Sequence, residues 1–562
     1  MKKNNFIIMI AAYVATIGVA LAAEYFVSPT GNDEADGSVG RPWRTIQRAA
    51  SAAIAGDVVT IRAGIYREWV KPANAGRADA PIVYRAAPGE KVVITGSDPI
   101  TEWSRRSDGL WEKNIPYDTF GGLNPFTDFI QGAWFSPKGR NHFRTRLIQN
   151  GEPLELHGED IYGKMTNGIP KIATGHAALI PGVVSGTIYA AFKSDPNVVV
   201  PELVVRPACF YALKTRRDYI VLRNIVFRNA GPQWGHPRGE QAGIVGSNWS
   251  RGWIIEDCEV SGSSCAGITL GKCANDFDAF WTDRKQSFGL WGKRLFERDL
   301  SEVGHHIVRR CRISDCGQAG ICGAYGAAFS LVEDCEISYC HWKKPFEGAE
   351  MAGIKFHAPV DSIIRRNRIH HNGSLGGIWI DWMGQGTCIQ DNVLWANQGH
   401  DIYLEVNHGP ILLEGNDMLS KNSVWFRSNN VAIIGNRIYG NFTCDRDEDN
   451  GSRKTPTLYP HSMKIKELFV STLPGNFIFI NNLMPNKPDF GKSIEYPCRF
   501  EDNWYVPRDY WKIDDVKGTV AVNPPAGSKK PVFKRVDKER LGKTVLLDQE
   551  FPECSGSIAG EL

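Results

Sequence analysis

Hydrophobic and polar positions between residues 220 and 441 follow a short repeating pattern. Each copy has Asn or Cys, any residue, an aliphatic residue, two variable residues, and then Asn or Cys again. The copies span residues 224–229, 311–316, 335–340, 367–372, 392–397 and 436–441, with weaker copies that start at Cys258 and Asn416. From Cys311 onward, the starts are separated by 24, 32, 25, 24 and 20 residues.

A unit of this length holds two or three strands of about five residues, which is too short for a pair of helices. Such a unit cannot bury its own apolar face, so it must stack on its neighbours. The pattern therefore predicts a parallel β-helix, in which equivalent residues of successive coils lie one rung, about 4.8 Å, apart. The 57 Gly in 562 residues exceed the average share of roughly 7% and agree with a turn-rich β chain.

The repeat also accounts for several of the 13 cysteines. Five of them occupy positions that other copies fill with Asn: Cys258, Cys311, Cys316, Cys335 and Cys340. Both residue types are small enough to stack in a column at a buried turn, where Cys behaves as a small hydrophobic group. We therefore favour stacked thiols over disulfides or metal ligands, and no Cys-x-x-Cys pair suggests zinc.

The beginning of the chain has the features of a signal peptide over residues 1–23. Lys2 and Lys3 precede an almost wholly apolar stretch from residue 6 to 21, and Ala20-Leu21-Ala22 offers a small-x-small cleavage site. We expect an exported protein, periplasmic or extracellular, without a membrane anchor in its mature form. The balance of 65 Lys+Arg against 62 Asp+Glu argues against a nucleic-acid partner.

The remaining chain divides into four parts. Residues 24–100 are expected to form an N-terminal cap and the first coils, with a capping helix over 42–56 that ends at Gly56. Over 101–207 the ladder pattern vanishes, which indicates an inserted all-β module. Residues 208–505 form the main β-helix that carries the active site, and residues 506–562 form an irregular tail. The fold class is therefore all-β.

Aligning one strand from each of four coils reveals the candidate chemistry. The segments 353–357, 377–381, 401–405 and 423–427 each place aliphatic or aromatic residues at two alternate positions that face inward. The other positions face outward as two columns, which are Lys355, Trp379, Tyr403 and Trp425, and His357, Asp381, Glu405 and Arg427. Intervals of 24, 24 and 22 residues place each member of the second column one rung from the next.

Asp381 and Glu405 should therefore lie about 5 Å apart. This separation suits a retaining glycoside hydrolase, whose two carboxyl groups stand about 5–5.5 Å apart. Repulsion between them keeps one carboxyl protonated to higher pH, as a general acid requires. The aromatic column offers faces on which a pyranose ring can stack. A charge ladder that only compensates itself on the surface is the competing interpretation, and the adjacent aromatic column disfavours it.

Three segments resemble those of the glycoside hydrolase family 120 β-xylosidases. They are residues 350–357, residues 377–387 and residues 405–410, and weaker similarity reaches most of the chain up to about residue 505. The resemblance implies a right-handed parallel β-helix with an inserted β-sandwich. It also implies that Asp381 is the nucleophile, that Glu405 is the acid/base, and that further residues bind the sugar. The candidate binding residues are Glu350, Lys355, His357, Trp379, Tyr403, Asn407 and Arg427.

The expected function is that of a retaining, exo-acting β-xylosidase that needs no cofactor or metal and acts on oligosaccharides. A polysaccharide lyase of the same fold stays open, with Lys355 or Arg427 as base and a carboxylate-bound calcium. A non-catalytic glycan-binding solenoid is the third reading. Residues 445–449 imitate the start of a calcium loop, but Asn450 and Pro456 break the pattern, which favours an exposed acidic turn. A homo-oligomer is compatible with all three.

Overall fold

The computed structural model describes residues 22–158, 172–237, 239–271, 304–382, 384–407, 409–445, 475–490, 494 and 498–523. The expected signal peptide therefore lies outside the described residues, except for its last two positions. None of the described helices is long and apolar enough to span a membrane.

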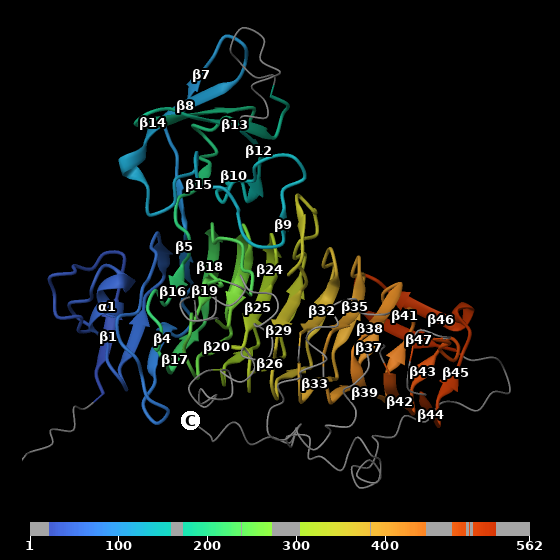
Figure 1. The fold of residues 1–562 in the computed structure, drawn as a ribbon. Helices are drawn as coiled ribbons and strands as arrows, with labels where there is room; N and C mark the ends of the chain where they lie inside the picture. The colour runs from blue at the N-terminus through green and yellow to red at the C-terminus, as the bar shows by residue number, and fades with distance from the viewer. Residues whose placement is uncertain are drawn as a thin grey trace, which may run out of the picture.

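Three long parallel sheets wind the chain into a β-helix along most of its length (Figure 1). The first sheet has the order β1 (Glu24–Val27), β2 (Val58–Ile61), β4 (Ile82–Ala86), β17 (Ile220–Arg223), β20 (Ile254–Glu256), β23 (Ile307–Arg309), β26 (Leu331–Glu333), β30 (Ile363–Arg365), β33 (Thr387–Gln390), β36 (Ile411–Glu414), β39 (Asn429–Ile434), β42 (Gly475–Ile480) and β44 (Arg499–Glu501).

The second sheet has the order β3 (Gly64–Tyr66), β5 (Val92–Thr95), β18 (Ile225–Ala230), β21 (Glu259–Ser263), β24 (Arg312–Cys316), β27 (Glu336–Ser338), β31 (Arg368–His370), β34 (Val393–Trp395), β37 (Asp417–Met418), β40 (Arg437–Ile438), β43 (Leu483–Met484) and β45 (Trp504–Tyr505). The third sheet has the order β16 (Phe210–Tyr211), β19 (Gly243–Gly246), β22 (Ala266–Thr269), β25 (Ile321–Ala324), β29 (Ile354–His357), β32 (Gly376–Asp381), β35 (His400–Glu405), β38 (Asn422–Arg427) and β41 (Asn441–Cys444).

One core runs along the axis of the β-helix, because every coil turns alternate side chains inward. Ile364, Ile369 and Ile378 come from the three strands of a single coil, and each is 0% exposed. Fully burying such a side chain contributes about 1.5–3 kcal/mol, and each coil repeats the contribution. The stacking predicted from the repeat is therefore what closes the core.

Two ladders of small polar side chains line the turns on either side of the second sheet. In the first ladder, the Asn392 amide nitrogen donates to the Asn416 side-chain oxygen at 3.0 Å, and Asn367 repeats the bond to Asn392 at 3.0 Å. Upstream, the Cys335 backbone N–H donates to the Asn367 side-chain oxygen at 2.9 Å. These amide groups satisfy one another and nearby backbone carbonyls inside the core.

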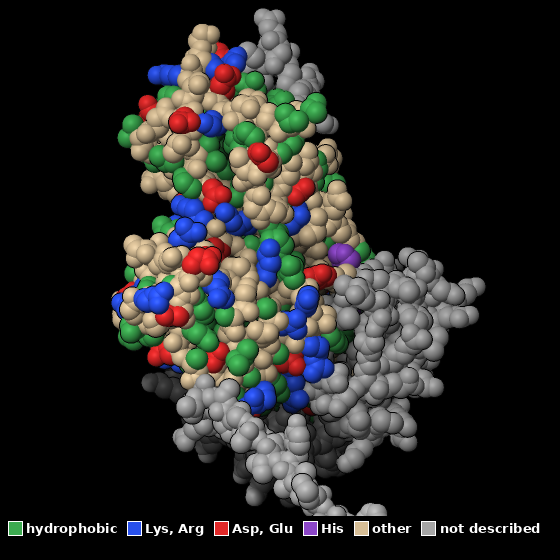
Figure 2. Space-filling view, turned by 90° about the vertical axis from the view of Figure 1, so that its left-hand side faces the viewer, with side chains coloured by type: hydrophobic (Ala, Val, Ile, Leu, Met, Phe, Trp, Pro, Cys, Tyr) green, Lys and Arg blue, Asp and Glu red, His purple; other side chains and the backbone are tan. Residues whose placement is uncertain are grey.

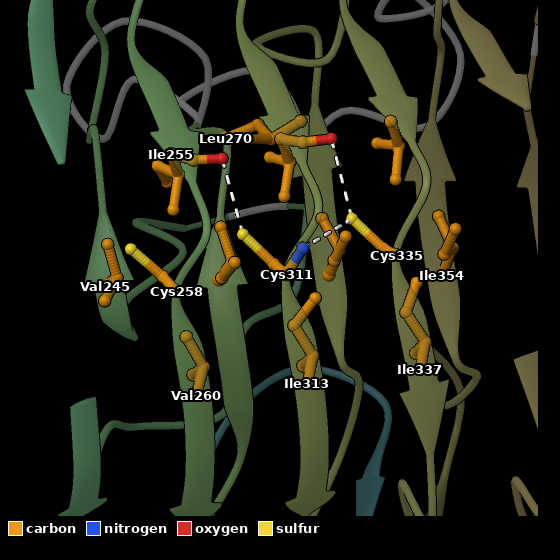
Figure 3. Packing of buried hydrophobic residues seen from close by; sticks show 14 of the residues in the cluster. Val245, Ile255, Cys258, Val260, Leu270, Cys311, Ile313, Cys335, Ile337 and Ile354 are labelled. Atoms are coloured by element: carbon orange, nitrogen blue, oxygen red, sulfur yellow. Dashed lines mark hydrogen bonds between the residues drawn. The ribbon is translucent and has the colours of Figure 1, made fainter. Parts of the chain in front are cut away.

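Cysteines continue the first ladder toward the N-terminus. Cys258, Cys311 and Cys335 point into the same interior as Val260, Ile313 and Ile337 (Figure 3). Five thiols of the two ladders are buried and free: Cys258, Cys311, Cys316, Cys335 and Cys340. The prediction of stacked thiols is confirmed.

The N-terminal end is covered by a short helix, α1 (Ile46–Ala52). Thr45 caps it, because its side chain accepts a hydrogen bond from the Arg48 N–H, and Ile46, Ala49 and Ala50 are buried. The capping helix is confirmed, but it is shorter than the predicted 42–56 and ends at Ala53 rather than at Gly56. Figure 2 views the molecule from this end and shows acidic and basic side chains interspersed over it.

The inserted module stands on one side of the β-helix (Figure 1). Its two sheets have the orders β11 (Glu152–Pro153), β10 (Leu147–Gln149), β15 (Glu202–Val204), β6 (Ser97–Pro99), and β12 (Glu155–His157), β13 (His176–Pro181), β14 (Ser185–Ala190), β8 (Trp111–Pro116), β7 (Ser104–Arg105). They enclose a separate hydrophobic cluster that includes Phe126, Leu179 and Ile188. A further strand, β9 (Phe135–Ser136), pairs with β28 (Glu347–Gly348) of the β-helix.

The predicted irregular tail is wrong for its described part. β46 (Trp511–Asp514) and β47 (Thr519–Val522) form an antiparallel hairpin. Trp511 is buried against Leu483 and Val506, and the Trp395 indole N–H donates to the Asp515 carbonyl at 2.6 Å. The repeat pattern could not reveal this hairpin because it packs on the outside of the coils. The tail beyond residue 523 lies outside the described residues.

Candidate active site

The outward face of the third sheet brings the candidate residues together on β29, β32, β35 and β38. The register pairs His357 with Asp381, Asp381 with Glu405, and Glu405 with Arg427. It likewise pairs Lys355 with Trp379, Trp379 with Tyr403, and Tyr403 with Trp425. All inward positions are 0% exposed, namely Ile354, Phe356, Ile378, Ile380, Ile402, Leu404, Val424 and Phe426. Both outward columns therefore lie as predicted.

Asp381 is held by two cationic or hydrogen-bonding neighbours on the preceding rung. The Lys355 ammonium donates to its Oδ2 at 2.8 Å, and the His357 Nδ1–H donates to the same oxygen at 3.1 Å. Burial opposes ionisation of Asp381, but these neighbours outweigh it and lower the pKa of the carboxyl from 3.8 to about 2. Asp381 is therefore a carboxylate at any ordinary pH.

Lys355 is a fully buried ammonium shared between two carboxylates. Its Nζ lies 3.1 Å from Glu350 Oε1 and 2.8 Å from Asp381 Oδ2, and it lies 4.1 Å from the centre of the Trp379 ring. Burial disfavours its charge, yet Asp381 and Glu350 together raise the pKa of Lys355 above the usual 10.5. A buried charge is stable only when it is paired in this way.

Glu350 reaches the cluster from a strained backbone. Its φ of 66° lies in the left-handed region that non-glycine residues rarely adopt. Burial raises the pKa of Glu350 above 4.5 in spite of the attraction of Lys355. The strained turn that follows β28 is therefore what aims this carboxyl at the ammonium.

Three buried polar atoms at this point have no hydrogen-bond partner among the described residues. They are Glu350 Oε2, His357 Nε2 and Trp379 Nε1, and all three side chains are at most 6% exposed. Buried polar atoms are nearly always hydrogen-bonded, so such a group points to a ligand that supplies the missing partners. Acceptors and an indole donor so close together suit a molecule with several hydroxyl groups.

Glu405 has a different environment on the next rung. The Tyr403 hydroxyl donates to it, and burial together with the Glu405 charge raises the pKa of Tyr403. Arg427 Nη1 lies 3.5 Å from Glu405 Oε1. The Arg427 guanidinium is also bound by Asp445 at 2.7 Å and 3.1 Å. Asp381 thus takes its partners from the preceding rung, whereas Glu405 takes its partners from its own strand and from the following rung.

The aromatic column corrects one prediction. Trp379 and Tyr403 are 3% and 2% exposed, and their ring centres lie 5.3 Å apart. Tyr403 in turn stacks on Trp425 at 4.5 Å. Their faces are occupied by one another and by Lys355, so they do not offer a platform on which a sugar ring can stack. Their polar atoms, the Trp379 indole nitrogen and the Tyr403 hydroxyl, are what they contribute.

Asn407 corrects a second prediction. It is 1% exposed, and its side-chain oxygen accepts a hydrogen bond from the Gly384 N–H at 3.0 Å. Its amide nitrogen donates to the Ile380 carbonyl at 2.9 Å and to the Ser428 hydroxyl at 3.0 Å. Because these bonds use its polar atoms inside the turn, Asn407 supports the backbone after β35 and does not bind substrate.

The Glu350, His357 and Asp381 donor atoms lie within 4.8 Å of one another, which is the spacing of a possible cation site. The Lys355 ammonium already donates to two of these three groups. A metal ion would have to displace a buried charge that both carboxylates stabilise. The donor set therefore fits the ammonium better than a metal ion.

Sequence reasoning missed two residues of the site. Trp382 follows Asp381 and stacks on His357 with ring centres 5.2 Å apart, which fixes the imidazole. Asp445 binds both Arg427 and the Trp425 indole N–H, although its side chain is 41% exposed. Residues 446–449 lie outside the described residues. Trp382 and Asp445 do not belong to the two outward columns, so no periodic pattern in the sequence marked them.

Comparison with known proteins agrees with this fold. The family description "Right handed beta helix region" matches residues 300–452. A solved structure of XylC in complex with xylose is similar to this chain with a TM-score of 0.73 and 28% identity, and the match covers 86% of this chain and 84% of XylC.

Two curated proteins match over shorter stretches. Pectate lyase PEL9 from Emericella nidulans is 38% identical over 88 residues, and the uncharacterized protein YwoF from Bacillus subtilis is 39% identical over 71 residues. These matches cover 15% and 13% of this chain, and only 22% and 15% of the length of the two relatives.

The fold and the similarity to XylC support a carbohydrate-active enzyme of the glycoside hydrolase type. The right-handed parallel β-helix is confirmed as the fold class. XylC is a family 120 β-xylosidase, so the resemblance to that family indicated by the sequence motifs is confirmed as well.

Proposed function

We propose that this chain is a retaining, exo-acting β-xylosidase that releases xylose from xylo-oligosaccharides. The observation that carries the proposal is the pairing of Asp381 with Glu405 on adjacent rungs, one carboxylate held by an ammonium and an imidazole and the other by a tyrosine. Adjacent rungs give the separation that a retaining mechanism needs. Similarity to XylC, whose structure contains xylose, supports the choice of sugar.

In the first step, Asp381 attacks the anomeric carbon of the terminal sugar and forms a covalent ester. Its Oδ2 accepts hydrogen bonds from Lys355 and His357, which leaves Oδ1 for the bond to carbon. Glu405 gives its proton to the glycosidic oxygen, and the shortened oligosaccharide leaves as an alcohol.

In the second step, Glu405 takes a proton from water, and the resulting hydroxide attacks the same carbon. The ester bond to Asp381 breaks, and xylose leaves with its original configuration. The unpartnered atoms of Glu350, His357 and Trp379 would bind the sugar hydroxyls during both steps. Hydrogen bonds to these hydroxyls hold the ring in place for attack.

The lyase alternative is disfavoured by the charge state of its base. A lyase base must be neutral before it removes a proton, but the two carboxylates raise the pKa of Lys355. Arg427 is bound at two points by Asp445. Neither Lys355 nor Arg427 is therefore the neutral base that proton abstraction requires.

The test is a comparison of aryl β-xyloside, aryl α-arabinoside and a uronate polymer as substrates of the purified chain. We expect cleavage of the β-xyloside, with the β-anomer of xylose appearing first in proton NMR spectra. Glu405→Ala should slow natural oligosaccharides far more than aryl substrates with good leaving groups, and Glu414→Ala on the first sheet is the matched control. An unsaturated product, or initial release of the α-anomer, would refute the mechanism.

We further propose that residues 1–23 direct export, because a xylosidase that meets its oligosaccharides outside the cytoplasm needs such a signal. Expression of the full chain and of a chain that starts at Glu24 would test this. We expect the full chain to be cleaved between Ala22 and Glu24. We expect the chain that starts at Glu24 to stay in the cytoplasm.

A further inference from the structure

A cavity of about 570 Å³ lies where the inserted module meets the β-helix. The module lines it with residues 140–143, 145, 146 and 151–156. The β-helix lines it with residues 314–317, at the end of β24, and with residues 339, 341–343, 345 and 346, after β27. It contains none of the residues of the candidate active site. In size it is comparable to pockets that hold small ligands.

The charges that line this cavity compensate one another. Arg140 pairs with Glu155 at 2.6 Å, and Arg146 of the module pairs with Asp315 of the β-helix at 2.6 Å. Lys343 and Glu152 add one charge of each sign, so three basic and three acidic side chains line the cavity. Such a lining favours a ligand without net charge. A charged ligand would be repelled by the side chains of its own sign wherever it bound in the cavity.

Other lining residues offer hydrogen bonds and aromatic surface. The His341 Nδ1–H donates to the Gly317 carbonyl at 2.7 Å, and its Nε2 has no partner among the described residues although the side chain is 2% exposed. Burial lowers the pKa of His341, so the neutral imidazole is favoured. Nearby, Tyr339 is 45% exposed and lies edge to face with the half-buried Trp342.

We propose that this cavity is a second binding site, and that its ligand is a short neutral oligosaccharide. A sugar combines apolar C–H faces, which pack on aromatic rings, with hydroxyl groups that can donate to or accept from charged side chains and an imidazole nitrogen. An apolar ligand would remove water from the two ion pairs without offering hydrogen bonds in return. The proposal does not depend on the activity at Asp381, because the two sites share no residue.

Binding of a sulfur-linked xylotetraose, which resists hydrolysis, tests the proposal by calorimetry on the full chain. We expect two sites on the unaltered protein and one site on the Trp342→Ala variant. Loss of affinity at the second site should be at least tenfold, about 1.4 kcal/mol. Turnover of an aryl β-xyloside should stay unchanged in the same variant, which separates this site from the catalytic one.

Tyr339→Ala is a second variant in case Trp342→Ala fails to fold, and Tyr505→Ala is its matched control. Tyr505 is 42% exposed, also belongs to the second sheet region and does not line the cavity. Tyr339→Ala should weaken the second site, and Tyr505→Ala should not. A single site that neither cavity variant affects would overturn the proposal, whether or not the enzyme proves to be a xylosidase. Two sites with unchanged affinities in both cavity variants would overturn it equally.

Discussion

Replacing Lys355 by Met should move the acidic limb of the pH–rate profile toward neutrality. Lys355 lies 2.8 Å from Asp381, and at an effective dielectric constant of about 20 this corresponds to an attraction of ~6 kcal/mol, or about four pKa units. Rearrangement and entry of water will recover part of that loss. We therefore expect the pKa of Asp381, which is about 2 in the native protein, to rise to between about 4 and 6.

The same change should remove a pH-dependent part of the stability. The folded state lowers the pKa of Asp381 from 3.8 to about 2, so this group stabilises the fold above about pH 4 and loses that contribution as the pH falls toward 2. The difference is roughly 2 kcal/mol. Removing the ammonium also leaves Glu350 and Asp381 buried without their shared cation, which costs about 3–5 kcal/mol.

The assay is kcat/KM for an aryl β-xyloside between pH 3 and 8, with circular dichroism to confirm folding. The native enzyme should show no acidic limb from Asp381 in this range, whereas Lys355→Met should lose activity as the pH falls below about 5. Lys355→Arg, which keeps the charge, is the matched control. A folded Lys355→Met protein with a native pH profile would refute the assignment of Lys355 to the ionisation of Asp381.

Three further predictions follow from the site and the ladders. Asp381→Ala should lower turnover about 10⁴-fold or more, and azide should restore it by forming a glycosyl azide of inverted configuration; near-normal activity without azide would contradict the nucleophile. Asn392→Ala breaks the bonds to Ile364 and Asn416 and should cost about 2–4 kcal/mol in urea unfolding; a loss below about 1 kcal/mol would contradict the ladder. Cys335→Asn should raise Tm, since an amide oxygen would replace the thiol that accepts the Cys311 N–H at 3.5 Å; a lower Tm would show that the turn has no room.

The β-helix and both outward columns were predictable because they are periodic. Stacked coils must place equivalent residues one rung apart, so the spacing of Asp381 and Glu405 already determined their register. The thiol ladder was predictable for the same reason, since Cys335 occupies the position that Asn367 fills in the next coil.

The features of the site that were not predictable depend on how individual side chains pack in the folded coils. Whether Trp379 and Tyr403 present their faces to solvent or to each other is decided by packing along the column. Asn407 follows a catalytic strand, and only the turn geometry shows that its amide serves the backbone. Asp445 reaches Arg427 from beyond β41, at a position that no spacing rule marks.

The change from thiols to amides in the first ladder has a consequence for how the molecule opens. Downstream of Asn367, each rung is fastened to the next by paired amide bonds, whereas the Cys311 and Cys335 rungs share only a weak N–H to sulfur contact. The weak contact lies between the coil of Cys311 and the next coil, which holds Cys335 and Lys355. The Cys335 N–H donates to the Asn367 side-chain oxygen at 2.9 Å, so amide bonds already join this coil to the one that supplies Asp381. Fraying from the N-terminal side would therefore stop at the coil that supplies Lys355, and backbone amide exchange should be slower from that coil onward than in the coils before it.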